Sequence, residues 1–168
     1  MKLKLFIIIL LGFIHMNVFE QAEKFKAGYI YQFTKYIEWP AAYKSGDFII
    51  GVLGSSSVQG PLNELAASKK VVDQTIKVES YGSVADIGKC HILYISEGQS
   101  GNLSAVIGKL SGSNTLVVAE KAGLAQAGAG INFIEKDGKL VFEVNQNGFS
   151  NQGLNVNSQL VNLAVNKY

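Results

Sequence analysis

Cys90 and His91 are neighbours in the sequence, and a thiol beside an imidazole is the pairing in this chain that could support nucleophilic catalysis. The other histidine, His15, lies in the apolar N-terminal segment. The apolar run from His91 to Ile95 is typical of a strand, in which successive side chains point to opposite faces. The two side chains therefore cannot form a dyad, and we expect both to have structural roles.

A single cysteine and two histidines in 168 residues exclude a disulfide framework and a zinc site with several Cys and His ligands. All 15 basic residues are lysines, whereas arginine is the residue that reads guanine edges and clamps phosphates. With 13 acidic residues, the net charge is only +2. Composition thus predicts a domain without a metal, a cofactor or a nucleic-acid partner, and we expect no enzyme activity.

A serine-rich turn from Gly54 to Gly60 could hold a small anion or another small ligand, because it follows a predicted strand and opens a predicted helix. It lacks the second glycine of a Gly-x-Ser-x-Gly elbow, and Pro61 stands where a P-loop has its lysine. A plain strand-to-helix turn is the default interpretation. The ligand-binding alternative would use Gly54, Ser55, Ser56 and Ser57.

Three acidic residues, Glu135, Asp137 and Glu143, surround the predicted turn of a hairpin. Acid–base catalysis needs partly buried carboxyl groups with separated pKa values. Glu143 alternates with apolar residues, so we expect it to face solvent. The three residues are therefore expected to be solvated charges.

The N-terminal segment has the layout of a secretory signal. Lys2 and Lys4 precede ten apolar residues that end at Ile14, and a membrane-spanning helix needs about 20. We therefore expect residues 1–22 to be a signal peptide, cleaved after Ala22, and no permanent membrane anchor. Residues 23–168 are then a single, exported domain.

The elements that must position these residues alternate along the chain. Apolar spacing predicts a helix from Glu23 that stops before Pro40 and buries Phe25, Tyr29, Phe33, Tyr36 and Ile37 on one side. Strands are predicted over 48–53, 75–78, 91–95 and 115–119, and helices over 58–67, 103–110 and 124–127. This alternation predicts an α/β fold with a layered sheet covered by helices on both faces.

The C-terminal part predicts an antiparallel hairpin, which makes the sheet mixed. Two apolar runs, 131–135 and 140–144, flank Asp137-Gly138, a strong signal for a tight turn. Phe133, Leu140, Phe142 and Val144 are expected to point inward. A closing helix should begin with Asn157 or Ser158 as its cap.

The first helix packs on the sheet in the simplest interpretation, and a partner surface is the alternative, because Tyr and Trp are enriched at protein interfaces. The partner-contact candidates are Tyr31, Lys35, Trp39 and Pro40.

Five phrases, in order, resemble the YfiR-like family, and together they cover residues 26–165. The first resembles the family's opening helix, with its Glu-Trp-Pro end, and the third its Cys-His-Ile-Leu-x-Ile-Ser strand. The others resemble the first strand, the hairpin and the closing Gly-Leu-x-Ile-Ser-Ser-x-Leu phrase. The phrases here are 26–40, 50–54, 88–96, 130–145 and 153–160.

This resemblance implies a periplasmic, non-catalytic regulator. The family's best-understood members restrain an inner-membrane diguanylate cyclase and so lower cyclic-di-GMP and biofilm, and other relatives accompany sensor kinases. The implied partner is therefore an inner-membrane sensor protein, either a diguanylate cyclase or a histidine kinase. A homodimer stays open.

One departure concerns redox control. Some relatives pair further cysteines as disulfides, and Cys90 matches one such position, but the position that resembles its partner is Gly51. With a single cysteine we expect no intramolecular disulfide. Cys90 is then a buried thiol or, alternatively, an intermolecular link.

Overall fold

The computed structural model describes residues 20–168. Residues 1–19 of the predicted secretory signal, including His15, lie outside the described residues, and residues 20–22 lie at the start of a helix. No helix among residues 20–168 combines the length and the apolar character needed to cross a bilayer.

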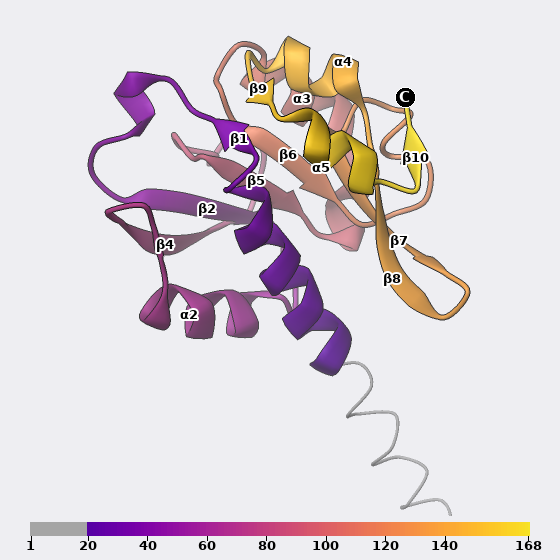
Figure 1. Cartoon of the computed structure of the whole chain (residues 1–168), viewed down its shortest axis with the longest axis horizontal. Helices are drawn as coiled ribbons and strands as arrows, with labels where there is room; N and C mark the ends of the chain where they lie inside the picture. Colours follow the sequence, from indigo (N-terminus) through magenta and orange to yellow (C-terminus); the bar gives the residue numbers. More distant parts are fainter. Residues whose placement is uncertain (1–19) are drawn as a thin grey trace, which may run out of the picture.

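An eight-stranded mixed sheet organises the described chain, in the order β10-β8-β7-β6-β5-β2-β4-β3 (Figure 1). Its centre is parallel, from β4 through β2, β5 and β6 to β7, and β8 and β3 join antiparallel. The strands are β2 (Phe48–Leu53), β3 (Lys70–Val71), β4 (Gln74–Tyr81), β5 (Ile92–Ile95), β6 (Leu116–Ala119), β7 (Ile131–Lys136), β8 (Lys139–Val144) and β10 (Asn166–Lys167). The predicted mixed α/β sheet is confirmed.

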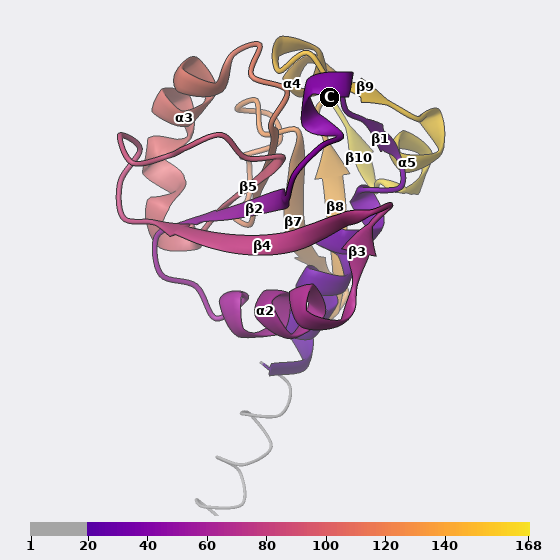
Figure 2. The same cartoon turned by 90° about the vertical axis from the view of Figure 1, so that its left-hand side faces the viewer.

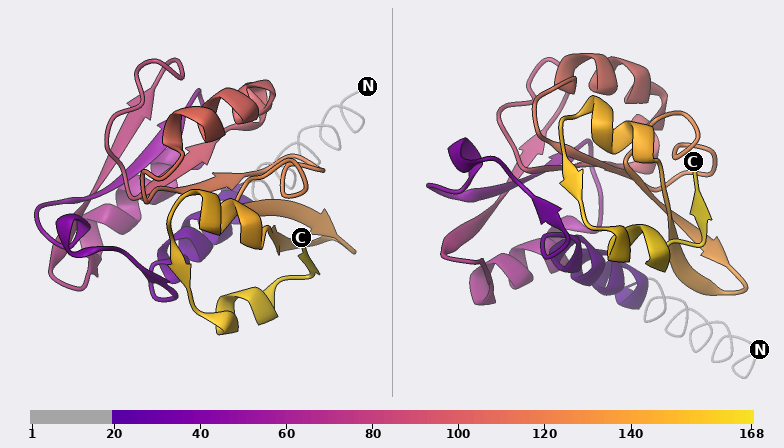
Figure 3. Two further views of the ribbon diagram at one scale, coloured as in Figure 1. Left: turned by 90° about the horizontal axis from the view of Figure 1, so that it is seen from above. Right: turned by 45° about the horizontal axis from the view of Figure 1, so that its top comes forward.

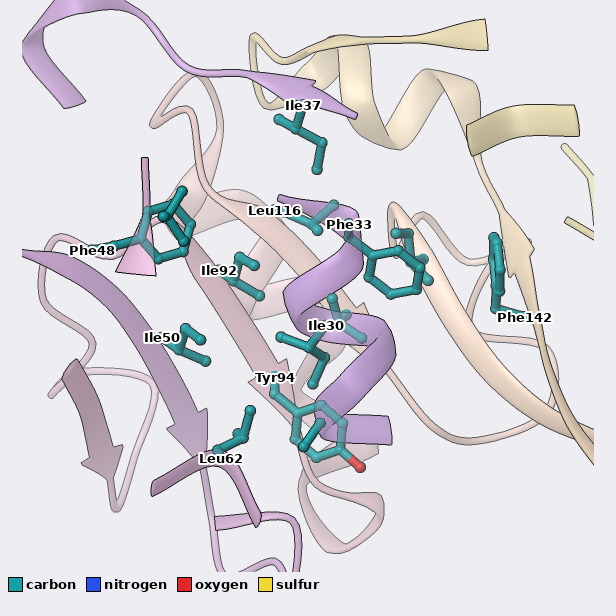
Figure 4. Packing of buried hydrophobic residues seen from close by; sticks show 14 of the residues in the cluster. Ile30, Phe33, Ile37, Phe48, Ile50, Leu62, Ile92, Tyr94, Leu116 and Phe142 are labelled. Atoms are coloured by element: carbon teal, nitrogen blue, oxygen red, sulfur yellow. The ribbon is translucent and has the colours of Figure 1, made fainter. Parts of the chain in front are cut away.

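Helices cover both faces of this sheet, as the alternation predicted (Figure 2). The first helix (residues 20–33) and α2 (Gln59–Ser68) cover one face, and α3 (Leu103–Leu110) covers the other. Figure 4 shows Ile30 and Phe33 of the first helix packed over Ile92, Tyr94 and Leu116 of the sheet.

The first helix is shorter than predicted, and its buried side agrees with the prediction only in part. It ends at residue 33, and Ile37–Glu38 forms a two-residue strand, β1, instead of a last helical turn. Phe33 and Ile37 are buried as predicted, and Tyr29 and Tyr36 are half-buried. Phe25 is 54% exposed, and Ala27 and Ile30 complete the buried face instead. The prediction was wrong because pairing of β1 with a distant strand, β9 (Asn155–Val156), overrides the local helical spacing.

The C-terminal part holds the predicted hairpin and two short helices (Figure 3). The helices are α4 (Gln146–Asn151), which was not predicted, and α5 (Ser158–Leu163), capped by the Asn157 side chain as predicted. The helix predicted over 124–127 is wrong, since this segment forms turns. Two short 3₁₀ helices, η1 (Ala41–Tyr43) and η2 (Glu97–Asn102), complete the elements.

The expected solvent exposure of Glu143 is also wrong. Its side chain is buried and accepts hydrogen bonds from Asn132 Nδ2 (3.2 Å), Asn166 Nδ2 (2.8 Å) and the Tyr168 hydroxyl (3.1 Å). The carboxylate thereby ties β10 and the C-terminal residue to the hairpin. Of the residues expected to point inward, Phe133, Phe142 and Val144 are buried, and Leu140 is half-buried.

Candidate functional site

A groove of about 760 Å³ lies at the amino ends of β2 and β4, and two segments of the chain form its walls. One wall is the β1–β9 ribbon with the turn before it, and the other is the β3–β4 hairpin. We call it the ribbon–hairpin groove. It is lined by Thr34, Lys35, Tyr36, Ile37, Glu38, Trp39, Lys44, Phe48, Val71, Val72, Asp73, Gln74, Asn155, Asn157 and Ser158.

The floor of the groove is a fixed aromatic pair. Trp39 and Phe48 meet edge to face, with ring centroids 5.1 Å apart. The indole Nε1–H of Trp39 donates to the Asn114 carbonyl at 3.0 Å, so the ring is held at both ends. Phe48 in turn stacks on His91 at 4.2 Å. Because the core holds these rings, the floor is formed before any ligand arrives.

Side-chain hydrogen bonds hold the hairpin wall. The Tyr31 hydroxyl donates to the Lys70 carbonyl at 3.2 Å, which ties the outer edge of β3 to the first helix. On the other side, Gln74 Nε2 donates to the carbonyls of Tyr43 (3.0 Å) and Gly46 (3.2 Å). The hairpin is thus fixed relative to η1 and to the loop before β2.

Val72, at the tip of this hairpin, has an unusual backbone. Its φ is +53°, and its side chain is 89% exposed. A β-branched residue in the left-handed region is a genuine outlier, because Cβ crowds the backbone there. Such strain clusters at functional sites, which draws attention to this rim of the groove.

The rim carries charges of both signs. Lys44 and Glu38 form an exposed ion pair with 3.8 Å between Nζ and Oε1. Lys35 lies over the Tyr31 ring, 5.7 Å from its centroid, and Asp73 lies on the hairpin wall. Neither Lys35 nor Asp73 makes an ion pair within residues 20–168. The two walls therefore present one unmatched cation and one unmatched anion to whatever enters.

The partner-contact candidates from the sequence fall into two groups. Lys35 and Pro40 are exposed and Tyr31 is half-buried, whereas Trp39 is only 5% exposed. Trp39 is therefore not a projecting contact residue, but it lines the groove together with Lys35. Sequence reasoning missed the hairpin wall, since its two-residue strand has no periodic signal.

The serine-rich turn lies at the carboxyl end of β2, where the strand order reverses between β4 and β5, and open α/β sheets commonly bind ligands at such a switch point. Here Gly54 has φ +82°, and a Cβ on it would lie 2.5 Å from Ser96 Oγ and from Gln99 Cγ. Its N–H donates to the Tyr81 carbonyl, and Ser56 Oγ accepts the Val58 N–H. Neighbouring groups thus occupy much of this turn.

The first helix closes the rest of this end of the sheet. Lys26 Nζ binds Glu23 Oε1 at 2.7 Å and Glu120 Oε2 at 2.6 Å, and these three side chains are 15%, 5% and 13% exposed. Burial lowers the pKa of the Lys26 ammonium, but the hydrogen bonds that it donates to Glu120 and Glu23 outweigh this effect and raise the pKa overall. The ion-paired Lys26 side chain thus occupies part of this end of the sheet.

Cys90 and His91 lie on opposite faces of the sheet. Cys90 is fully buried among Tyr81, Leu93 and their neighbours, and burial raises the pKa of its thiol to about 12. His91 is 4% exposed, and burial lowers its pKa. A protonated, buried thiol and a buried imidazole on the far face give no nucleophile–base pair.

Gly51, which resembles a cysteine position of some relatives, faces the same cluster as Cys90. A Cβ on Gly51 would lie 2.5 Å from Cε2 of Tyr81 and 3.1 Å from Cδ1 of Leu93. The Tyr81 ring therefore fills the space in which a side chain at position 51 would stand. Within residues 20–168, no group of three or more His, Cys, Asp and Glu side chains could hold a metal ion.

The architecture resembles a solved structure, the ABC domain in complex with L-Trp from Streptococcus pneumonia, with a TM-score of 0.53 and 12% sequence identity. The similarity covers 72% of this chain and 55% of that one, so this chain spans about half the length of the protein it matches. At such low identity the likeness shows the fold alone. No curated protein matches the chain in sequence.

A family model described as YfiR/HmsC-like matches residues 23–165, a range that contains both walls of the groove. The family is one of periplasmic regulators in general, and it is regulatory rather than catalytic. Its members act with membrane signalling proteins in general. The resemblance found in the five sequence phrases is therefore confirmed, and the chain belongs to the YfiR/HmsC-like family.

Proposed function

We propose that this chain is an exported, periplasmic regulator that binds the periplasmic part of one inner-membrane signalling protein, a diguanylate cyclase or a sensor histidine kinase, and changes its output. The observation that carries the proposal is the family match over residues 23–165. Binding to a cyclase would connect the chain to cyclic-di-GMP and biofilm control.

The geometry supports binding rather than catalysis. The thiol and the imidazole of the described chain are both buried in structural positions, whereas the ribbon–hairpin groove is open to solvent and carries unmatched charges. Lys35 and Trp39, which belong to the first family-like phrase, line this groove. We place the contact surface there.

Deletion of the gene, followed by measurement of cyclic-di-GMP and of phosphorylation of the candidate kinases, tests the regulatory role. We expect one of these signals to change and the wild-type chain to restore it. The Lys35→Glu variant should fail to restore the signal although it folds normally. Lys121→Glu, an exposed lysine outside the groove, is the matched control and should restore the signal fully.

A direct measurement separates the two partner classes. The purified chain is titrated against the periplasmic domains of the candidate cyclase and of the candidate kinase. We expect binding to one of them, weakened at least tenfold by Lys35→Glu, since a contact hot spot is worth about 2 kcal/mol or more and tenfold corresponds to about 1.4 kcal/mol. An unchanged signal in the deletion strain, with no binding to either domain, would refute the proposed function.

A further inference from the structure

The β1 strand has one edge without hydrogen-bond partners. Opposite residues in an antiparallel pair alternate between hydrogen-bonded and non-hydrogen-bonded pairs. The Asn157 N–H donates to the Tyr36 carbonyl at 2.8 Å, next to the Ile37–Val156 pair, so this pair is non-hydrogen-bonded. The N–H and C=O of Ile37 therefore point away from β9. Within residues 20–168, the backbone groups of Ile37 and Trp39 make no hydrogen bond.

This unpaired edge borders the ribbon–hairpin groove. Figures 1 and 3 place β9 on one side of β1 and the β2–β4 part of the sheet on the other side. Ile37 and Trp39 both line the groove, together with Val71 to Gln74 of the facing hairpin. An unpaired strand edge is a template for another strand, because its N–H and C=O groups need partners away from water.

The groove has the chemistry for the side chains of such a strand. Its floor, Trp39 and Phe48, suits an apolar side chain, and alternate residues of a strand point to the same face. Lys35 on one wall matches an acidic side chain, and Asp73 on the other matches a basic one.

We propose that the ribbon–hairpin groove binds an extended peptide segment of a partner protein, which adds to the open edge of β1 as a third strand of the β1–β9 ribbon. The segment carries an apolar residue over Trp39 and Phe48, flanked by an acidic residue facing Lys35 and a basic residue facing Asp73. Only the identity of the partner rests on the proposed function, since the groove itself defines the peptide.

Display of random eight-residue peptides against the purified full-length chain tests this proposal without a known partner. We expect the selected peptides to share an apolar residue with an acidic and a basic residue on its two sides. Hydrogen exchange should then show the Ile37 amide slowed at least tenfold by the bound peptide. Methylation of the peptide backbone nitrogens, one at a time, should weaken binding at least tenfold at alternate positions.

Charge exchange checks the orientation. Lys35→Glu should weaken a selected peptide at least tenfold, and the peptide with its acidic residue changed to lysine should regain the affinity. Asp73→Lys should likewise weaken the selected peptide at least tenfold, and the peptide with its basic residue changed to an acidic one should regain the affinity. Lys121→Glu and Glu135→Lys, both exposed and away from the groove, are the controls and should change nothing.

Three results would overturn the proposal. Selected peptides without the shared pattern would show that the groove does not choose a sequence. Peptides that bind without slowing exchange at Ile37 would show that β1 is not the template. Slow hydrogen exchange of the Ile37 amide without any peptide, slowed further as the protein concentration rises, would mean that a second copy of the chain occupies the edge. Failure here with an intact regulatory response in the deletion strain leaves the proposed function standing.

Discussion

His91 and Ile49 bond to each other twice. The His91 N–H donates to the Ile49 carbonyl at 2.9 Å, and the Ile49 N–H donates to Nδ1 of the His91 ring at 3.0 Å. The other ring nitrogen, Nε2, lies 2.8 Å from the Tyr43 carbonyl and therefore carries the proton. The imidazole thus extends the ladder of β2, and both of its nitrogens are used only while the ring is neutral.

This arrangement predicts a pH-dependent stability. Burial, helped by the charge of Lys89, lowers the pKa of His91 below 6.5 against the opposing bond to the Tyr43 carbonyl. As the pH falls through 6.5, the unfolded chain takes up a proton and the folded chain does not, so the free energy of unfolding must fall. Below the folded-state pKa of His91, this residue causes no further loss of stability. Urea unfolding at pH 7.5, 6.5 and 5.5 measures the free energy of unfolding at each pH.

The control for this prediction is His91→Gln, which has no titrating ring. The variant should be less stable by about 1–3 kcal/mol at pH 7.5, because a buried donor or acceptor loses its partner. Its stability should depend less on pH between 7.5 and 5.5 than that of the wild type. Equal slopes in the two proteins would show that His91 is not the group that titrates.

Cys90 should be unreactive in the folded protein. Its thiol is fully buried, and burial raises its pKa to about 12, so almost no thiolate forms at pH 8. We expect Ellman's reagent to modify it only after unfolding in urea. Ala67→Cys in a Cys90→Ser chain places an exposed thiol on α2 and should react at once. Fast modification of native Cys90, or a disulfide-linked dimer, would contradict the buried position.

Lys26 should be worth several kcal/mol to the fold. Lys26→Ala leaves the carboxylates of Glu23 and Glu120 facing each other in a largely buried site, which costs about 3 kcal/mol. Lys77→Ala, which breaks an exposed pair with Asp47, is the matched control and should have little measurable effect. Because the pKa of Lys26 is raised, its contribution holds below pH 10.5 and is lost as the pH rises further.

Sequence patterns predicted elements with long apolar runs, but not the short strands that form only by pairing with distant parts of the chain. The bounds of β2 and α3 agree with their apolar runs, because such runs select a strand or a helix locally. The two-residue strands β1 and β9 carry no period, and their pairing depends on residues more than a hundred positions apart. Helix α4 was missed because it contains Gly148, a poor helix former, whose missing side chain lets Gly128 approach.

The candidate site was predicted only in part for the same reason. The first family-like phrase contains Lys35 and Trp39, which form one wall and the floor of the groove. The burial of Trp39 follows from Asn114 and Phe48, and the hairpin wall follows from Tyr31 and Gln74, and none of these contacts is local in sequence. A groove between two segments of the fold has no sequence motif of its own.

Gly51 should not accept a side chain. Gly51→Ala places a Cβ only 2.5 Å from Tyr81 Cε2, and overpacking of this kind costs about 1–3 kcal/mol. Gly108→Ala in α3 has open space around it and should instead stabilise the protein by about 1 kcal/mol. In a Tyr81→Ala background the cost of Gly51→Ala should shrink. An equal cost in both backgrounds would mean that Tyr81 is not the obstacle.

Val72 should be replaceable with a gain in stability. At φ +53° a β-branched residue costs roughly 1–2 kcal/mol, and asparagine tolerates this conformation better. The side chain is 89% exposed, so little apolar contact is lost, and Val72→Asn should raise the free energy of unfolding by about 1 kcal/mol. Val165→Asn, an exposed valine without positive φ, is the control and should bring no gain. If Val72→Asn stabilises the fold but weakens partner binding, the strain at the rim is retained for contact; if it destabilises the fold, the hairpin tip is not strained.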